Sequence, residues 1–168
     1  MYQNERYLLT PTIRVTSDVQ QFQQSIRQAR HAPKHAQPYA YVQALNYYRG
    51  AFLPGCYNAW VIEQREQLAA EMLWVREEYA YWLLDDGRLD AAETEARAVI
   101  DVDPLRERAW HLLLRALLQQ RRTVEAVNAY QRLTKLLHDE VGIEPSPDIQ
   151  RLLGAIHPPR HRLAQTVP

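Results

Sequence analysis

The chain has 168 residues, of which 46% are hydrophobic, so it is long enough for one domain with a genuine core. Its 20 lysines and arginines balance 20 acidic residues, which excludes a protein whose overall charge attracts a polyanion. The single cysteine, Cys56, excludes an internal disulfide and is expected to be a buried small side chain. The sequence lacks a run of roughly 18 apolar residues, which predicts a cytoplasmic protein without membrane contact.

Residues 1–16 are expected to form an extended arm, because Ile13 and Val15 alternate with polar residues. Ser17 then starts a helix, since Gln20 follows it by three residues and completes a capping box. The apolar residues of this helix recur at helical spacing. They are Val19, Phe22, Ile26 and Ala29.

Metal, cofactor and catalytic sites are not expected. His31 and His35 are four residues apart, as metal ligands on a helix are, but Pro33 interrupts that helix and no third ligand is near. The sequence also lacks a glycine-rich phosphate loop, a nucleophile elbow and a two-histidine zinc motif, so no enzymatic activity is predicted. The carboxylates expected on solvated helix faces or turns are Glu77, Glu78, Asp85, Asp86, Glu93 and Glu95.

Two helices are predicted before the repeated region. The first ends near Gly50 and carries Tyr41, Leu45 and Tyr48, and Pro54-Gly55 forms the turn that follows. The second begins at Tyr57 and runs for about 28 residues, with apolar positions at steps of three and four. These positions are Val61, Leu68, Met72, Val75, Tyr79 and Leu83, and a second stripe of Trp60, Trp74 and Tyr81 widens the apolar face.

Residues 79–137 repeat with a period of 34. Leu83 and Leu117 occupy the same place in the two halves, as do Ala92 and Ala126. This period is that of the tetratricopeptide repeat, a helical hairpin that buries its apolar face only by stacking on neighbours. We therefore predict an all-α fold, a tetratricopeptide-like α-α superhelix of about seven helices with a short extended N-terminal arm.

Glycines and prolines mark the predicted helix ends. Gly87 is expected to end the first repeat helix in a left-handed conformation, and Asp103-Pro104 to cap the start of the next hairpin. Gly142 is expected to close the last long helix in the same way. Ser146 then caps a short amphipathic helix that covers the end of the repeats.

Charge is segregated along the chain. Residues 62–104 hold 12 acidic and 4 basic residues, whereas residues 105–138 hold 7 basic and 2 acidic ones. Arg108, Arg115 and Arg122 recur at sevens, so on a continuous helix they share one face. We expect this face to be solvated or to contact an acidic helix rather than to read DNA directly.

Several motifs, in a consistent order along the chain, carry a family resemblance. They are residues 48–55 with Trp60 and Arg65, residues 103–110, residues 125–127 with Tyr130, and residues 137–147. Together they resemble the bacterial transcriptional activator domain of regulators similar to the Streptomyces antibiotic regulatory proteins. Residues 120–122 depart from that pattern, because the family tends to have a glycine at this turn.

The resemblance implies a regulatory protein-interaction domain at residues 17–156 that performs no chemistry. In such regulators a winged-helix DNA-binding domain usually comes first, so residues 1–16 are expected to be a junction to a domain absent from this chain. Residues 157–168 are expected to be a disordered tail. The implied partner is RNA polymerase or another regulator domain, with DNA contacted only through the absent domain, and homodimerisation stays open.

Two other functions stay open. A peptide-binding adaptor outside transcription would use a groove lined by Asn128 and Arg132, which are four residues apart. A small-ligand sensor would need a closed apolar pocket, for which the place under Trp60 and Trp82 is the candidate. For the regulatory domain, the predicted partner contacts are the arginine face and exposed aromatic side chains. These residues are Arg108, Arg115, Arg122, Tyr47 and Trp74.

Overall fold

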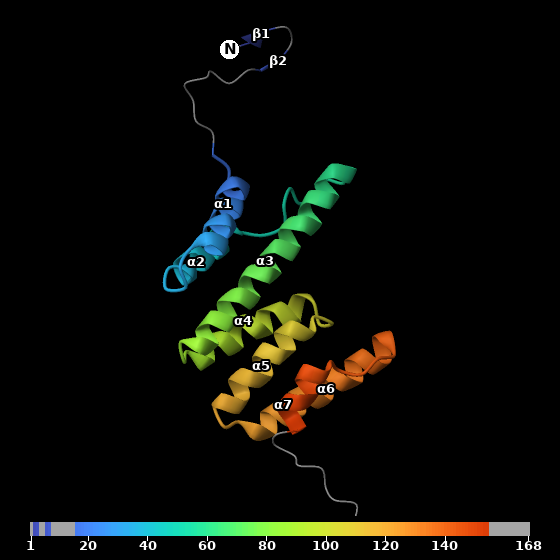
Figure 1. The fold of residues 1–168 in the computed structure, drawn as a ribbon. Coiled ribbons are helices and arrows are strands. Elements are labelled where there is room, and N and C mark those ends of the chain that lie inside the picture. Colours follow the sequence, from blue (N-terminus) through green and yellow to red (C-terminus); the bar gives the residue numbers. More distant parts are fainter. Residues whose placement is uncertain (1, 4–5, 8–15, 155–168) are drawn as a thin grey trace, which may run out of the picture. The chain divides into compact units, whose positions relative to one another are not determined.

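The computed structural model describes residues 2–3, 6–7 and 16–154. Within them, two short strands pair antiparallel, β1 (Tyr2–Gln3) with β2 (Arg6–Tyr7). Residues 8–15 of the predicted arm and the predicted tail at 157–168 lie outside the described part of the chain. The all-α prediction is confirmed (Figure 1), with helices α1 (Asp18–His31), α2 (Gln37–Tyr47), α3 (Ala59–Asp85), α4 (Leu89–Val102), α5 (Glu107–Gln119), α6 (Thr123–Val141) and α7 (Pro147–Gly154).

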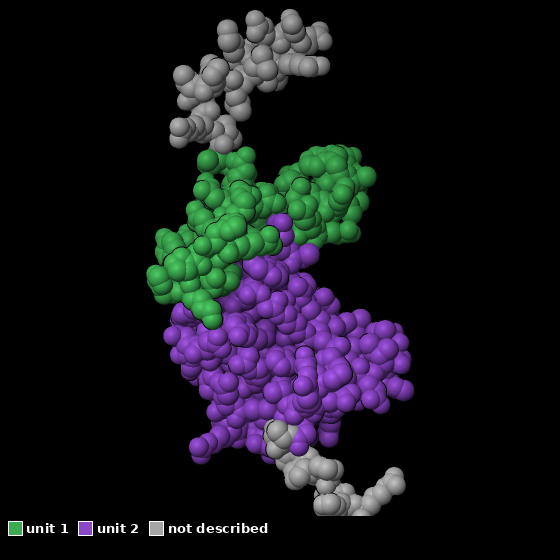
Figure 2. Space-filling model, viewed as in Figure 1, with its two compact units in different colours: residues 1–68 green, residues 69–168 purple. Residues whose placement is uncertain are grey.

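The chain divides into two compact units (Figure 2), residues 1–68 and residues 69–168. In the first unit, α1 packs against α2. In the second unit, α5 packs against α4, α6 and α7. Among the described residues, no helix combines the length and the apolar character required to cross a membrane.

The start of α1 is a capping box, as predicted. The Ser17 hydroxyl oxygen accepts a hydrogen bond from the Gln20 N–H at 3.1 Å, and the Gln20 side-chain oxygen accepts one from the Ser17 N–H at 3.2 Å. These bonds satisfy two N–H groups that have no partner within the helix. Phe22, Ile26 and Ala29 are buried on one face of α1, which confirms most of the predicted stripe.

The loop between α2 and α3 is held by one side chain of α3. The Arg65 guanidinium donates hydrogen bonds to the main-chain carbonyls of Phe52, Leu53 and Cys56, at 2.9, 2.7 and 3.0 Å. Leu53 adopts a positive φ of 42°, which costs energy in a residue with a Cβ. Cys56 is half-buried in this loop, so the expectation of a buried side chain is met only in part.

The long helix α3 begins two residues later than predicted. Its apolar stripe is confirmed at Val61, Leu68, Val75 and Leu83, all of which are buried. The predicted second stripe is wrong in part, because the Trp60 side chain is 59% exposed and Tyr81 is 43% exposed. A helix of this length has faces that no neighbour covers, and these residues lie on such faces.

The two repeats turn in the same way. Gly87 has a φ of 77°, and Arg121, 34 residues later, has a φ of 60°. The N–H of Gly87 bonds to the Leu84 carbonyl at 3.2 Å, and the N–H of Arg121 bonds to the Leu118 carbonyl at 3.0 Å. The turn at residues 120–122 therefore keeps the left-handed geometry without the family's glycine.

The prediction that Asp103-Pro104 caps the second hairpin is wrong. Asp103 instead ends α4, with its N–H bonded to the Val99 carbonyl at 2.9 Å, and α5 begins only at Glu107. The intervening residues form a turn in which the Arg106 N–H bonds to the Asp103 carbonyl at 3.2 Å. Arg106 therefore occupies the N-cap position of α5, and no side-chain hydrogen bond caps this helix.

The C-terminal helix boundaries fall at the predicted residues, although no hydrogen bond of the Ser146 hydroxyl to a described residue caps α7. Gly142 has a φ of 72° and closes α6, and α7 begins at Pro147 directly after Ser146. Ile149 and Leu153 of α7 are buried where this helix packs on α5. The repeat core is likewise buried at its equivalent positions, Leu83 with Leu117 and Ala92 with Ala126.

Candidate functional site

The three arginines predicted to form one partner-binding face do not lie on one helix. Arg108 and Arg115 belong to α5, but α5 ends at Gln119 and Arg122 immediately precedes α6. The assumption of a continuous helix through all three is therefore wrong for Arg122.

Both arginines of α5 already contact α3. Arg108 donates a hydrogen bond to the Glu78 carboxylate at 2.5 Å. Arg115 lies 4.0 Å from an Asp85 carboxylate oxygen, and its guanidinium lies 5.6 Å from the centre of the Tyr81 ring. The opposite charges of the two sequence segments are thus used between neighbouring helices of the second unit.

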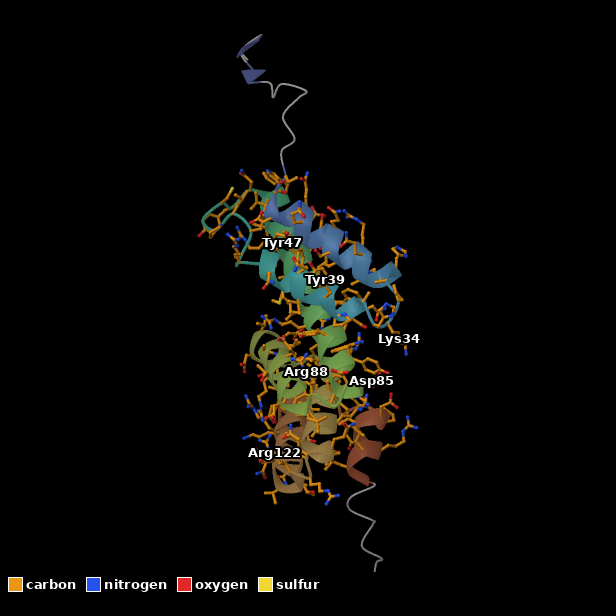
Figure 3. All side chains as sticks on the ribbon, turned by 90° about the vertical axis from the view of Figure 1, so that its left-hand side faces the viewer. Lys34, Tyr39, Tyr47, Asp85, Arg88 and Arg122 are labelled. Carbon is orange, nitrogen blue, oxygen red and sulfur yellow. The ribbon has the colours of Figure 1, made fainter. Side chains whose placement is uncertain are left out.

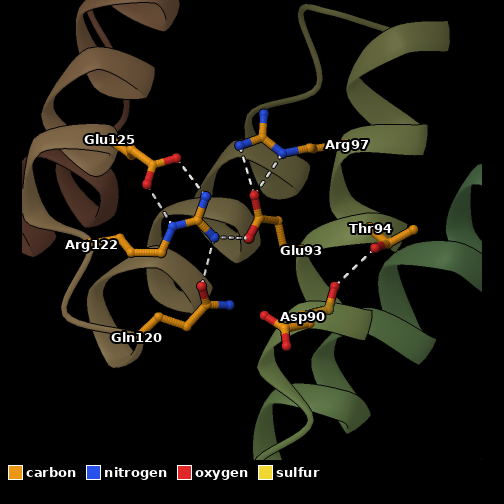
Figure 4. A network of polar contacts seen from close by, with 7 residues as sticks. All are labelled: Asp90, Glu93, Thr94, Arg97, Gln120, Arg122 and Glu125. Atoms are coloured by element: carbon orange, nitrogen blue, oxygen red, sulfur yellow. Dashed lines mark hydrogen bonds and ion pairs between the residues drawn. The ribbon is translucent and has the colours of Figure 1, made fainter.

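Arg122 is the centre of a polar network (Figure 4). Its guanidinium donates to both carboxylate oxygens of Glu125, at 2.6 and 2.5 Å, and to Glu93 at 2.5 Å. It also donates to the Gln120 side-chain oxygen at 2.7 Å, and Glu93 accepts a further bond from Arg97 at 2.9 Å. The network joins α4 to the start of α6.

The network keeps its charged groups ionised. Burial alone would raise the pKa of Glu93, but hydrogen bonds from Arg97 and Arg122 outweigh it and lower that pKa below its usual value. The hydrogen bond from Arg122 lowers the pKa of Glu125, and that bond in turn raises the pKa of Arg122. The positive charge of Arg122 is therefore neutralised within the domain.

Some carboxylates predicted on solvated faces are not solvated. Glu77 is 1% exposed and accepts hydrogen bonds from Arg106. Glu95 is paired with Arg76 at 2.5 Å, with 18% of its side chain exposed. The prediction is wrong for these residues, because an ion pair with an arginine distant in sequence offsets the free-energy cost of removing the carboxylate from water.

A hollow of about 330 Å³ lies among α4, α5 and α6. We call it the α4–α6 groove. Its floor is formed by the buried α5 residues Trp110 and Leu113. The α4 side is lined by Arg97, Ile100 and Asp101, and the α6 side by Glu125, Asn128, Ala129 and Arg132. The Arg122 network contributes Arg97 and Glu125 and so holds the two sides together.

The structure brings Asn128 and Arg132 together on the α6 side of this groove. Both side chains are exposed, and neither has a hydrogen bond or ion pair among the described residues. Asp101, on the α4 side of the groove, is also exposed and also has no side-chain hydrogen bond or ion pair among the described residues. These three residues differ in this from the arginines of the predicted face, each of which forms an ion pair with a carboxylate.

Arg132 lies over the floor of the groove. Its guanidinium carbon is 5.7 Å from the centre of the Trp110 ring, a cation–π contact that holds the side chain in place. Trp110 itself is fixed by a hydrogen bond from its indole N–H to the Pro104 carbonyl at 2.8 Å. A second hollow of about 310 Å³ shares Trp110 and Arg132 and continues past Lys135 and Leu136.

The predicted aromatic contacts fall in different units. Tyr47 is the last residue of α2 in the first unit (Figure 3), half-buried beside a hollow of about 330 Å³. Trp74 is half-buried on α3 in the second unit. Of the tryptophans suggested for a ligand pocket, Trp60 is exposed in the first unit, and Trp82 stacks on Tyr79 at 6.5 Å in the second.

Within the part of the chain that the structure describes, no three His, Cys, Asp or Glu side chains are placed to hold a metal ion. The groove offers hydrogen-bonding groups above an apolar floor. The spacing of Asn128 and Arg132 indicated its polar side, whereas the floor residues Trp110 and Leu113 read in the sequence as ordinary core.

Comparison with known proteins agrees with this fold. The sequence pattern of the bacterial transcriptional activator domain matches residues 17–157. Regulatory protein AfsR of Streptomyces coelicolor is 34% identical over 110 residues, which are 66% of this chain and 11% of that protein. Regulatory protein AfsR of Streptomyces griseus is 34% identical over 109 residues, 62% of this chain and again 11% of the relative. The chain thus spans about a tenth of the length of these relatives.

A solved structure has a similar fold. It is Mycobacterium tuberculosis EmbR in complex with a low-affinity phosphopeptide, which superimposes with a TM-score of 0.72 and 24% sequence identity. The similar region covers 83% of this chain and 38% of that chain. This similarity confirms the predicted tetratricopeptide-like helical fold, and the sequence matches confirm the family resemblance.

Proposed function

Because this chain belongs to the bacterial transcriptional activator domain family, we propose that it is the protein-contacting part of a transcriptional regulator and performs no chemistry. Its place of action is then the cytoplasm, with the transcription machinery. The matched region covers 11% of each relative, so the proposal concerns this domain and not the whole of those proteins.

The α4–α6 groove is the observation that supports this proposal most strongly. It combines a buried apolar floor with polar side chains that have no partner among the described residues. Interfaces of this kind, with apolar anchors surrounded by hydrogen-bonding groups, are typical of peptide and protein recognition. Asn128 and Arg132 are the proposed partner contacts.

The arginines predicted on one face have a different proposed role. Arg108, Arg115 and Arg122 neutralise carboxylates of neighbouring helices, so we propose that they hold the stacked helices in place. With these charges neutralised, the chain is poorly suited to binding DNA by itself. Tyr47 and Trp74 remain predicted contacts.

RNA polymerase holoenzyme is the proposed partner, and binding to it can be measured by biolayer interferometry with the immobilised chain. The test variant carries Asn128→Ala and Arg132→Gln, and the matched control is Arg27→Gln, an exposed arginine of α1 in the first unit. We expect the groove variant to bind at least about tenfold more weakly, since a charged hydrogen bond contributes about 1.5–3 kcal/mol. Equal binding by the groove variant, or no binding by the wild type, contradicts the proposal.

A further inference from the structure

We infer that the α4–α6 groove binds an extended peptide segment in which a carboxylate side chain lies next to an apolar side chain. The inference rests on the proposed function and specifies the chemistry of the partner. Three features of the groove carry it. They are Asn128 and Arg132, which have no hydrogen bond or ion pair among the described residues, the apolar floor, and the excess of acidic over basic side chains around the groove.

The spacing of the two polar residues matches an extended chain. Asn128 and Arg132 are four residues apart on α6, which corresponds to about 6 Å along the helix axis. An extended segment advances about 6.6 Å for every two residues. A peptide running along α6 therefore places one residue at Asn128 and the second residue after it at Arg132.

The chemistry of each side chain selects a different part of the peptide. The Arg132 guanidinium has only donors, and their fork geometry matches the two oxygens of a carboxylate. The Asn128 amide has both a donor and an acceptor, so it matches the N–H and C=O of a peptide group. Neither side chain must give up a hydrogen bond to a described residue in order to bind.

The floor provides the apolar part of the site. Ile100 and Leu113 are buried beside the hollow, and Ala129 leaves room on the α6 side. Arg132 is already positioned by its contact with the Trp110 ring at 5.7 Å, so less side-chain freedom is lost when a carboxylate binds. An aliphatic or aromatic side chain next to the carboxylate fills the hollow and excludes water from that ion pair.

The charge at the border favours a peptide over a nucleic acid. Three carboxylates that border the groove and its adjoining hollow, those of Asp101, Asp139 and Glu140, have no ion pair among the described residues, against two such cationic side chains, Arg132 and Lys135. A polyanion such as DNA would meet several of these carboxylates at once and be repelled. A segment with a single carboxylate directed at Arg132 avoids them.

The test uses the full chain and a phage-displayed library of decapeptides. The central residue is Glu in one half of the library and Gln in the other, with the remaining positions randomised. We expect the selected peptides to carry Glu at least about tenfold more often than Gln, with an aliphatic or aromatic residue within two positions. The preference should vanish for Arg132→Gln, weaken for Arg132→Lys, which keeps the charge but loses the fork, and persist for Arg27→Gln.

Equal recovery of Glu and Gln peptides, no recovery of either, or a preference that survives Arg132→Gln overturns the inference. Competition by a 20-base-pair DNA duplex, measured against a selected fluorescent peptide, also overturns it. The polymerase measurement separates this outcome from failure of the proposed function. If polymerase binding still depends on Asn128 and Arg132, only the ligand chemistry is wrong, whereas if it does not, the groove is not the contact site.

Discussion

Arg106 and Glu77, 29 residues apart in the chain, form a two-pronged ion pair inside the second unit. The guanidinium donates hydrogen bonds of 2.8 and 3.1 Å to the two carboxylate oxygens of Glu77, which is 1% exposed. Glu77 comes from α3 and Arg106 from the turn before α5, so the pair joins the acidic and basic segments of the sequence. The opposite charges of these segments are therefore a structural feature of helix stacking.

Replacing one partner of this pair should destabilise the protein strongly. Glu77→Leu leaves the Arg106 guanidinium largely buried without a carboxylate, and we expect a loss of about 3 kcal/mol in the free energy of unfolding. Urea denaturation followed by circular dichroism measures this change. The double variant Glu77→Leu with Arg106→Leu should lose less than Glu77→Leu alone, because it removes both charges.

A neighbouring pair is the matched control. Glu78 contacts Arg108 with 24% and 47% of the two side chains exposed, so water screens their attraction. Glu78→Gln should change the free energy of unfolding by less than about 1 kcal/mol. If Glu77→Leu cost no more than this control, the buried pair would not hold α3 to the following repeat.

The equivalent turns of the two repeats should respond in opposite directions to substitution. Gly87 and Arg121 both adopt a left-handed backbone, which costs a residue with a Cβ about 1–2 kcal/mol. Gly87→Ala should therefore destabilise the protein by about 1 kcal/mol, and a Cβ there meets no other atom, so backbone strain is the cause. Arg121→Gly should stabilise it by about 0.5 kcal/mol, after the greater freedom of glycine in the unfolded chain is subtracted.

Melting temperatures of both variants, measured under the same conditions, check this prediction. A double variant that exchanges the two residues, Gly87→Arg with Arg121→Gly, serves as the control. Its stability should lie near that of the wild type if the two turns are equivalent. Stabilisation by Gly87→Ala would show that the turn does not require the left-handed conformation.

These turns illustrate what the sequence could predict. The 34-residue period and Gly87 indicate a helical hairpin because glycine is favoured at a left-handed helix end. The same conformation at Arg121 carries no local signal, since arginine itself disfavours it. There the packing of the repeat imposes the geometry on an unfavourable residue.

Burial of a charged residue is a feature that the sequence alone did not predict. A glutamate on a helix, such as Glu77, reads as a solvated position because burial of an unpaired charge is very costly. Only the three-dimensional approach of Arg106 makes the burial possible. By contrast, Asn128 and Arg132 could be placed on one side of a helix from their spacing alone, whereas the floor beneath them depends on α5.

The Arg122 network should make stability depend on pH in the acid range. The pKa of Glu93 in the folded protein lies below its usual value near 4.5, so the unfolded chain binds more protons than the folded one as the pH falls. Its contribution is therefore present above pH 4.5 and is lost as the pH falls through the folded pKa. Glu93→Gln should cost about 1–2 kcal/mol at neutral pH and progressively less in acid.

Urea denaturation at about pH 7 and about pH 3.5 measures both numbers. The control is Glu63→Gln, an exposed glutamate of α3 in the first unit. Its effect should be small at both pH values. An effect of Glu93→Gln that is equally large at the two pH values would contradict the role of its ionised carboxylate.

His111 should give a second pH dependence, closer to neutrality. Burial, and then the charge of Arg115, lower the pKa of His111 below 6.5, although Asp148 opposes the shift. Because the folded protein binds a proton less readily than the unfolded chain, the contribution of His111 is present above pH 6.5 and is lost as the pH falls through its folded pKa. Melting temperatures from about pH 8 to about pH 5 should fall less steeply for His111→Gln than for the wild type.

Asp148→Asn is the variant that distinguishes this cause from a general effect of acid. Asp148 borders the same hollow as His111 near the start of α7, and its negative charge favours the protonated imidazole. Its removal should lower the pKa of His111 further and make the melting temperature fall more steeply with decreasing pH, in the opposite direction to His111→Gln. Identical slopes in all three proteins would show that protonation of His111 does not affect how α5 and α7 pack.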